Sequence, residues 1–300
     1  MKVLVSLIIA DSDYQQAQAA AAEEVARGLN LRIEIIYAGT DAVHQTQQLV
    51  KAIQDRANRP DAVLVEPVGT GMDQIAAAAV AAGVGWGIVN REVNYLARLR
   101  RSARAPVFAV STDQLEVGRI QGRQFAALLG QGGSVLYIEG PSTAGATQQR
   151  RAGMMSTKPA DASVKTLKGD WSEGSAYRVV KSWLLLSTAR QLDIQVIGCQ
   201  NDLMAAGARK AFEELPSLVE RDHWLSLPFT GCDGVPKTGL KQVSHGLLSA
   251  TVIIPPTMGL ALQILHNAVK AGSQPPELTL SAPTSFPTPD ELARKPVAAQ

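Results

Sequence analysis

Short apolar runs alternate with longer segments of helical periodicity along almost the whole 300-residue chain. The runs are continuously apolar, which is typical of parallel strands buried on both faces of a sheet. The longer segments have apolar residues at the spacing of amphipathic helices. We expect strands at 2–9, 32–37, 62–65, 86–89, 106–110, 134–138, 164–167, 194–199, 225–231 and 248–253. We expect helices at 14–28, 42–56, 72–82, 115–129, 147–155, 174–186, 203–215, 235–245 and 257–271.

This alternation predicts an α/β fold, and the number of units exceeds one comfortable sheet. We therefore predict two similar doubly wound parallel-sheet lobes joined by a three-strand hinge, with a ligand cleft between them. The N-terminal lobe is expected to comprise residues 1–112 plus 253–280, and the C-terminal lobe residues 113–252 plus 281–300. The Pro- and Ser-rich sequence from Ser273 onward is expected to be an irregular crossing segment.

Polar and aromatic side chains recur where the predicted strands end. In parallel sheets, ligands bind beyond the carboxyl ends of the strands. The stretch at 200–202, Gln-Asn-Asp, poses the question most clearly, because Asn201 or Asp202 could simply cap the next helix. Capping does not explain Tyr14, Arg91 or Trp171 at equivalent positions. The pattern therefore favours a shared cleft lined by strand ends.

Composition excludes several classes of function. Lys plus Arg is 29 and Asp plus Glu is 27, a net charge of +2, which favours neither a nucleic-acid partner nor a membrane surface. The basic stretch at 98–104 is interpreted as a solvated loop face. The two cysteines, Cys199 and Cys232, are too few for a disulfide scaffold and form no C-x-x-C motif, so buried free thiols are expected, although pairing between neighbouring strands is conceivable. No metal or cofactor is expected.

An enzyme is the disfavoured alternative. The segment 68–79 follows a strand and opens a helix as a dinucleotide loop would, but Gln74 stands where the third glycine belongs. The chain has no Walker loop, G-x-S-x-G elbow or H-E-x-x-H motif. Ser142 is interpreted as a turn or ligand contact rather than a nucleophile, and no catalytic residue is predicted.

Five motifs carry a resemblance to a known family: QNDLMAAGARKAF, TGCDGVPKTG, VNRE, STDQLEVGRIQG and QQRRAGM. The chain resembles the type I periplasmic solute-binding proteins, in particular their ribose- and other sugar-binding branch, whose fold is shared by the ligand-sensing cores of lactose-repressor-type transcription factors. The resemblance extends from about Lys2 to Phe286. It implies a solute-binding function in which two lobes close on a small ligand.

The resemblance also implies which residues bind that ligand. The family's positions fall on Asp11, Ser12, Tyr14, Asn90, Arg91, Gln114, Arg150, Trp171, Asn201 and Asp233. A sugar ring can stack on Trp171 or Tyr14, and amide, carboxylate and guanidinium groups can each bind adjacent hydroxyls. The sequence departs from the ribose binders at Asn90, which replaces a carboxylate, and at Ile254, which replaces a hinge glutamine. Because Arg91 and Arg150 then face fewer acids, a small sugar, a polyol and a sugar acid all remain candidate ligands.

The resemblance further implies a membrane importer or receptor as partner, a monomeric protein, and a location in the periplasm or otherwise outside the cytoplasmic membrane. The apolar segment 2–9 is interpreted as the first strand rather than a signal peptide, so any export signal is expected to be missing from this chain. A ligand-sensing protein that signals to a regulatory or receptor partner is the alternative function, and a cytoplasmic location is the alternative to export.

Overall fold

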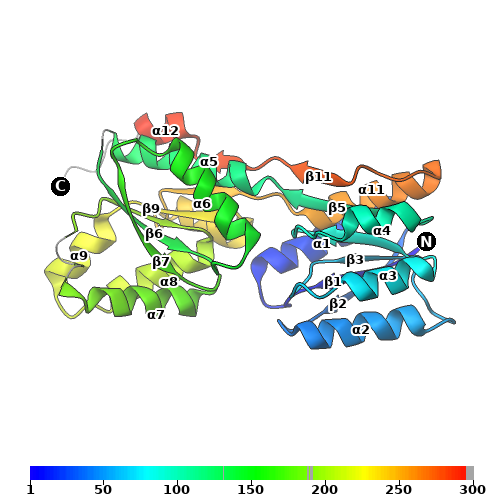
Figure 1. Ribbon diagram of the computed structural model, residues 1–300. Coiled ribbons are helices and arrows are strands. Elements are labelled where there is room, and N and C mark those ends of the chain that lie inside the picture. The colour runs from blue at the N-terminus through cyan, green and yellow to red at the C-terminus, as the bar shows by residue number, and fades with distance from the viewer. Residues whose placement is uncertain (131, 188, 190–191, 295–300) are drawn as a thin grey trace. The chain divides into compact units, whose positions relative to one another are not determined.

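A computed structural model describes residues 1–130, 132–187, 189 and 192–294. Residues 295–300, which the sequence analysis assigns to the C-terminal lobe, lie outside this description. The chain forms two compact units: unit 1 comprises Met1–Thr112 and Pro255–Ser281, and unit 2 comprises Asp113–Ile254 and residues 282–300. The chain therefore passes from one unit to the other three times, after Thr112, Ile254 and Ser281. Figure 1 labels most of the helices and several strands of both units.

Unit 1 is a parallel sheet in the order β11-β5-β4-β3-β1-β2. Its strands are β1 (Lys2–Leu7), β2 (Arg32–Tyr37), β3 (Ala62–Val65), β4 (Gly85–Val89), β5 (Val107–Thr112) and β11 (Leu278–Ser281). Its helices are α1 (Asp13–Gly28), α2 (Ala42–Gln54), α3 (Asp73–Ala81), α4 (Leu96–Ser102) and α11 (Thr257–Ala271). Two apolar clusters cover the sheet, one under α2, α3 and α4 and the other under α1 and α11.

Unit 2 repeats this order as β12-β10-β9-β8-β6-β7. Its strands are β6 (Ser134–Glu139), β7 (Ser163–Lys168), β8 (Val196–Cys199), β9 (Phe229–Asp233), β10 (Ala250–Ile253) and β12 (Thr284–Phe286). Its helices are α5 (Gln114–Leu129), α6 (Gly145–Thr157), α7 (Glu173–Leu184), α8 (Asp202–Glu213), α9 (Leu218–Ser226), the π-helical turn η2 (Pro236–Leu240), α10 (Lys241–Ser244) and α12 (Pro289–Arg294). The predicted fold of two doubly wound α/β lobes is confirmed.

Several local elements differ from the sequence expectation. The basic stretch predicted as a loop contains α4, because Leu96 and Leu99 lie one turn apart and are both buried. The strand predicted at 225–231 begins only at Phe229, because α9 occupies Leu218–Ser226. Ser217 caps this helix by accepting from the backbone N–H of Glu220. The helix predicted at 235–245 is divided into η2 and α10.

The segment after Ser273 is more ordered than predicted. β11 pairs in parallel with β5, and β12 pairs antiparallel with β10, so each sheet gains an edge strand from this part of the chain. Such pairing is decided by distant strands, and a four- or three-residue strand has too little periodicity of its own to be recognised.

Candidate functional site

The first polar cluster lies in unit 1 at the carboxyl ends of β1, β3 and β4. The Asn90 side chain donates to the Tyr14 hydroxyl at 3.2 Å and accepts from the Thr257 hydroxyl at 2.7 Å. The Gln15 side-chain amide donates to Glu66 Oε2 at 2.9 Å, and its carbonyl oxygen accepts from the backbone N–H of Ile8 at the end of β1. We call Asn90, Tyr14, Thr257, Gln15 and Glu66 the Asn90 cluster.

The sequence analysis missed three residues of this cluster, Gln15, Thr257 and the acid Glu66. Glu66 directly follows β3, and only 6% of its surface is exposed. Burial raises the pKa of Glu66, while hydrogen bonds from Gln15 and Asn90 and the Arg91 charge act in the opposite direction. Its position directly after a buried strand was the signal that could have identified it.

The remaining predicted residues of unit 1 are less closely connected. Arg91 directly follows Asn90 in the chain and is half-buried, and its charge acts to lower the pKa of Glu66. Asp11 is exposed and Ser12 is half-buried. Ser12 lies at the N-cap position of α1 without a side-chain bond to the helix, within the part of the chain that the structure describes. The structure therefore joins Tyr14 and Asn90 directly, and leaves Asp11 and Ser12 at the edge of the cluster.

The second polar cluster lies in unit 2 around Arg150, which is 6% exposed on α6. Its Nε donates to Gln114 Oε1 at 2.8 Å, and its Nη1 donates to the backbone carbonyl of Gln200. The guanidinium carbon lies 5.4 Å from the centre of the Trp171 ring, within the range of a cation–π contact. With Asn201, these residues form what we call the Arg150 cluster.

Trp171 follows β7 with a positive φ of 75°, a conformation that bulky residues rarely adopt. Its ring lies against Gly140, where a Cβ atom would come within 2.3 Å of the indole. Its backbone carbonyl accepts from the Asn201 side chain at 2.8 Å. The ring is half-buried, so part of its surface remains accessible to a ligand.

The polar residues after β8 have different tasks. Asn201 caps α8 by accepting from the backbone N–H of Met204 at 2.8 Å, so the capping interpretation is correct for this side chain. Its amide N–H nevertheless holds Trp171, as described above. Gln200 is fully buried, accepts from the Gly140 backbone N–H at 3.0 Å, and presents its own carbonyl to Arg150. This strand end thus both caps a helix and supports the Arg150 cluster.

Asp233 and Asp202 form a pair of neighbouring carboxyl groups. Asp202 is 3% exposed and accepts from the Thr251 hydroxyl at 2.7 Å and the Gly234 backbone N–H at 2.8 Å. Burial and the Asp233 charge raise the pKa of Asp202 well above its usual range. Asp233 is half-buried, with a φ of 101°, and its carbonyl accepts from the buried Ile254. Asp202 is thus a structural acid, and Asp233 is the more accessible one.

Helices α5 and α6 fix the distance between Gln114 and Arg150. The backbones of the two helices lie in close contact at Gly118. A Cβ atom on this residue would lie only 2.0 Å from the Arg150 carbonyl oxygen. A Cβ on Gly153 would likewise lie 2.0 Å from the Leu115 carbonyl oxygen. The Arg150 backbone is therefore held against α5 by direct contact.

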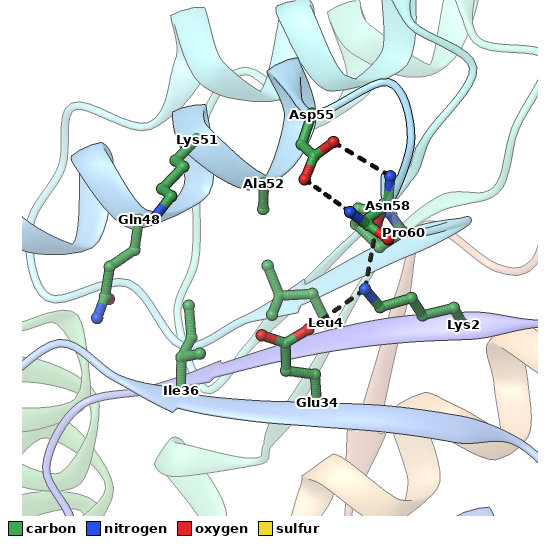
Figure 2. A pocket seen from close by; sticks show the side chains of 10 residues that line it. All are labelled: Lys2, Leu4, Glu34, Ile36, Gln48, Lys51, Ala52, Asp55, Asn58 and Pro60. Carbon is green, nitrogen blue, oxygen red and sulfur yellow. Dashed lines mark hydrogen bonds and ion pairs between the residues drawn. The ribbon is translucent and has the colours of Figure 1, made fainter.

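A separate cavity of about 450 Å³ lies in unit 1 between α2 and the strands β1 and β2 (Figure 2). Its apolar wall includes Leu4 and Ile36, and its charged groups bond to one another: Lys2 Nζ lies 3.4 Å from Glu34 and donates to the Asn58 carbonyl. None of the predicted ligand residues lines it. We interpret it as a gap in helix–sheet packing, since Lys2 pairs with Glu34 and the Asn58 carbonyl, and the Asn58 side chain donates to Asp55.

Three further observations concern other classes of site. Among the described residues, no group of three or more His, Cys, Asp and Glu side chains is placed to hold a metal ion. None of the helices in the described ranges combines the length and the apolar composition needed to cross a bilayer. Cys199 and Cys232 are both buried free thiols.

The fold is similar to that of solved solute-binding proteins. An ABC transporter periplasmic solute-binding protein from Actinobacillus succinogenes with bound D-allose superposes with a TM-score of 0.80, at 20% identity over 95% of this chain and 96% of that one. The periplasmic binding protein of the arabinose ABC transporter from Shewanella sp. ANA-3, bound to L-arabinofuranose, superposes with a TM-score of 0.79, at 21% identity over 98% of this chain and 93% of that one. The fructose-binding periplasmic domain of a hybrid two-component system superposes with a TM-score of 0.77, at 22% sequence identity over 95% of this chain and 90% of that one.

No curated protein sequence matches the chain. The sequence profile of the periplasmic binding protein domain, by contrast, matches residues 3–272, which is most of the chain. Binding proteins of this kind are not enzymes, in agreement with the prediction. From its profile, its paired α/β lobes and the polar strand ends of each lobe, we conclude that the chain belongs to the periplasmic binding protein family.

Proposed function

We propose that the protein is a solute-binding protein that captures a small sugar-like ligand at its polar strand ends. The observation that carries this proposal is the arrangement around Trp171. A half-buried indole lies beside the Arg150 guanidinium, and the amides of Gln114 and Asn201 belong to the same cluster. An aromatic face next to planar hydrogen-bonding groups suits a ring with an apolar face and a rim of hydroxyls.

The similar structures support this class of ligand, since two of the three are described with bound D-allose and L-arabinofuranose. We further propose that the protein works outside the cytoplasmic membrane as a monomer and passes its solute to an ABC-type importer. A sensor role is the second candidate, because one similar structure belongs to a two-component signalling system.

Thermal-shift screening against pentoses, hexoses, polyols and sugar acids tests the proposal. A true ligand at a hundredfold excess over its Kd stabilises the folded protein by ~2.7 kcal/mol. We expect a concentration-dependent rise in Tm with at least one of these compounds. A rise with amino acids or peptides, and none with any polyhydroxylated compound, would refute the sugar assignment.

The role is tested once a ligand is known. An importer reconstituted in proteoliposomes should hydrolyse ATP faster in the presence of the liganded protein than with the ligand-free protein. If the importer does not respond and a membrane-bound receptor kinase changes its autophosphorylation instead, the sensor role replaces transport.

A further inference from the structure

Three glycines follow one another at short intervals around the end of β9, at positions 231, 234 and 239, and the stretch between them contains Asp233. The Asp202 carboxyl group fills the space beside two of them. A Cβ atom on Gly231 would lie 2.1 Å from Asp202 Oδ1, and a Cβ atom on Gly239 would lie 2.0 Å from Asp202 Oδ2. Residues without a side chain are therefore needed here, because the chain wraps around a buried carboxyl group.

The Asp202 carboxyl group is itself fixed in place. It is 3% exposed, its Oδ1 accepts from the Thr251 hydroxyl on β10 at 2.7 Å, and its Oδ2 accepts from the Gly234 backbone N–H at 2.8 Å. Its backbone forms the first residue of α8, the helix that Asn201 caps. A buried polar group whose atoms are bonded in this way favours a single arrangement of its surroundings. Asp202 is thus a rigid support for the chain that follows β9.

The bond to Gly234 matters because of the peptide group to which its N–H belongs. The peptide between Asp233 and Gly234 is held at both of its polar atoms, since its N–H donates to Asp202 and its carbonyl oxygen accepts from the Ile254 N–H at 3.0 Å. A peptide group is planar, so bonds at both atoms fix its orientation. Asp233 has a φ of 101°, a conformation that persists only where the surroundings hold it. Fixing this peptide therefore fixes the direction in which the Asp233 side chain leaves the backbone.

The turn after Asp233 closes around the same carboxyl group. Residues Pro236–Leu240 form the π-helical turn η2, in which the Leu240 N–H donates to the Val235 carbonyl at 3.2 Å. Such turns are wider than α-helical ones and are frequent at functional sites. Gly239 lies in this turn, and its Cβ atom would come within 3.0 Å of the Gly234 Cα. The wide turn thus returns the chain to Gly234 and completes the wrap around Asp202.

We propose that Asp202 is a positioning residue that holds the peptide between Asp233 and Gly234 so that the Asp233 carboxylate is aimed at a bound sugar. This proposal rests on the proposed function. Asp202 does not touch the sugar itself, because its carboxyl group is buried and its two oxygens bond Thr251 and Gly234. It acts through Asp233, which is half-buried at the end of β9.

Isothermal titration of the full chain with D-allose, L-arabinose, D-fructose, sorbitol and D-glucuronate tests the proposal. For each of these compounds that the wild type binds, Asp202→Ala should weaken binding at least about tenfold, the effect of losing one hydrogen bond to a charged group. Asp202→Asn should retain most of the affinity. Its amide oxygen can accept from the Gly234 N–H while its amide nitrogen donates to the Thr251 hydroxyl.

A double-mutant cycle with Asp233→Ala separates positioning from a general loss of stability. If Asp202 acts through Asp233, Asp202→Ala should change the affinity by less than about twofold once Asp233 has been replaced. Gly239→Ala is a second route should Asp202→Ala fail to fold, because it keeps Asp202 but displaces its carboxyl group from Gly234, and it should also weaken binding. Ser217→Ala is the matched control: it removes a helix cap of the same unit and should lower stability without changing affinity.

Hydrogen exchange at the Gly234 amide tests the bond directly. By NMR, this amide should exchange slowly in the wild type and in Asp202→Asn, and faster in Asp202→Ala; equal rates in all three proteins would contradict the proposed role. Unchanged affinity in Asp202→Ala or Gly239→Ala, or an equal loss with and without Asp233, overturns the proposal and leaves the proposed function standing. A wild type that binds none of the five compounds overturns both.

Discussion

Asn90, Trp171 and Asp233, three of the residues predicted to bind the ligand, have positive φ angles of 58°, 75° and 101°. Residues in this region of backbone conformation cost of the order of 1–3 kcal/mol each and persist where the surroundings hold them. The surroundings are visible here: Thr257 bonds Asn90, Asn201 holds the Trp171 carbonyl, and Ile254 donates to the Asp233 carbonyl. Such concentration of strain at strand ends is typical of binding sites.

Trp171 should report ligand binding by fluorescence. Of the four tryptophans, Trp86, Trp183 and Trp224 are at most 7% exposed, whereas Trp171 is half-buried at the Arg150 cluster. We expect a sugar identified by the thermal screen to change the intrinsic emission of the wild type, and Trp171→Phe to abolish that change. A ligand-dependent signal that persists in Trp171→Phe would place the ligand elsewhere.

Arg150 should not be replaceable by lysine. A lysine has a single ammonium group, so it cannot bond Gln114 and the Gln200 carbonyl through a planar fork while lying on Trp171. We expect Arg150→Lys to weaken sugar binding at least about tenfold and to lower the free energy of unfolding by about 1–3 kcal/mol. Titration calorimetry and urea denaturation measure the two effects.

The adjacent Arg151 provides the control for this variant. It is on the same helix, but its side chain is 51% exposed and pairs with Glu139 at 3.1 Å. Arg151→Lys keeps that ion pair and should change affinity and stability little. Equal losses of affinity and stability in the two variants would contradict a specific role of Arg150.

At the scale of elements, the contact between α5 and α6 decides where Arg150 lies. Close approach of the two backbones depends on Gly118 and Gly153, since either Cβ would meet a carbonyl oxygen at 2.0 Å. A distance this short cannot be relieved by a side-chain rotation, because the opposing atom belongs to the backbone. Any side chain at these positions must push the helices apart.

Gly118→Ala should therefore damage both stability and binding. We expect a loss of about 1–3 kcal/mol in the free energy of unfolding, as for other overpacked cores, and weaker sugar binding because α6 carries Arg150 away from Gln114. Gly145→Ala at the start of α6 is the control, since a Cβ there meets nothing within 4 Å. Urea midpoints and titration of both variants make the comparison. A harmless Gly118→Ala would contradict the proposed backbone contact.

At the scale of the whole molecule, the two units have the same strand order although they differ in sequence. Each has its polar cluster at the carboxyl ends of the central strands, around the position where a doubly wound sheet reverses its order. Three buried carboxyl groups, Glu66, Glu139 and Asp202, accompany these strand ends, and burial is the largest cause that raises the pKa of each. Stability should therefore depend on pH.

The sign of this dependence follows from proton binding. A carboxyl group with a raised pKa in the folded state binds more protons than the unfolded chain does between about pH 4 and its folded pKa. The free energy of unfolding should therefore decrease as pH rises through this window. Asp202→Asn removes one such group, so its urea midpoints should fall less steeply than those of the wild type from pH 4 to 8. An identical slope in both proteins would show that Asp202 does not titrate in this range.

The sequence by itself determined the class of fold, because the relevant signals are local. A strand such as Ala62–Val65, which is apolar at every position, must be covered by other elements on both faces of its sheet. The 3.6-residue periodicity of Thr257–Ala271 specifies a helix with one buried face. The polar ends of the strands were also visible, which is why Tyr14, Asn90, Gln114, Trp171 and Asn201 could be proposed together, whereas Arg150, inside a helix, was proposed only from the family resemblance.

Only the tertiary structure decided which of these residues meet. Asn90 and Thr257 bond across 167 positions, and β11 joins β5 across a similar distance. The place of Glu66 also emerged only there: in the sequence it is one acid before a proline, and in the fold its buried carboxylate accepts from the Gln15 amide, 51 positions away. Periodicity records whether a residue is buried, which depends on its nearest neighbours in the chain. The identity of its hydrogen-bond partners depends on which strands and helices are packed together, and no local pattern contains that information.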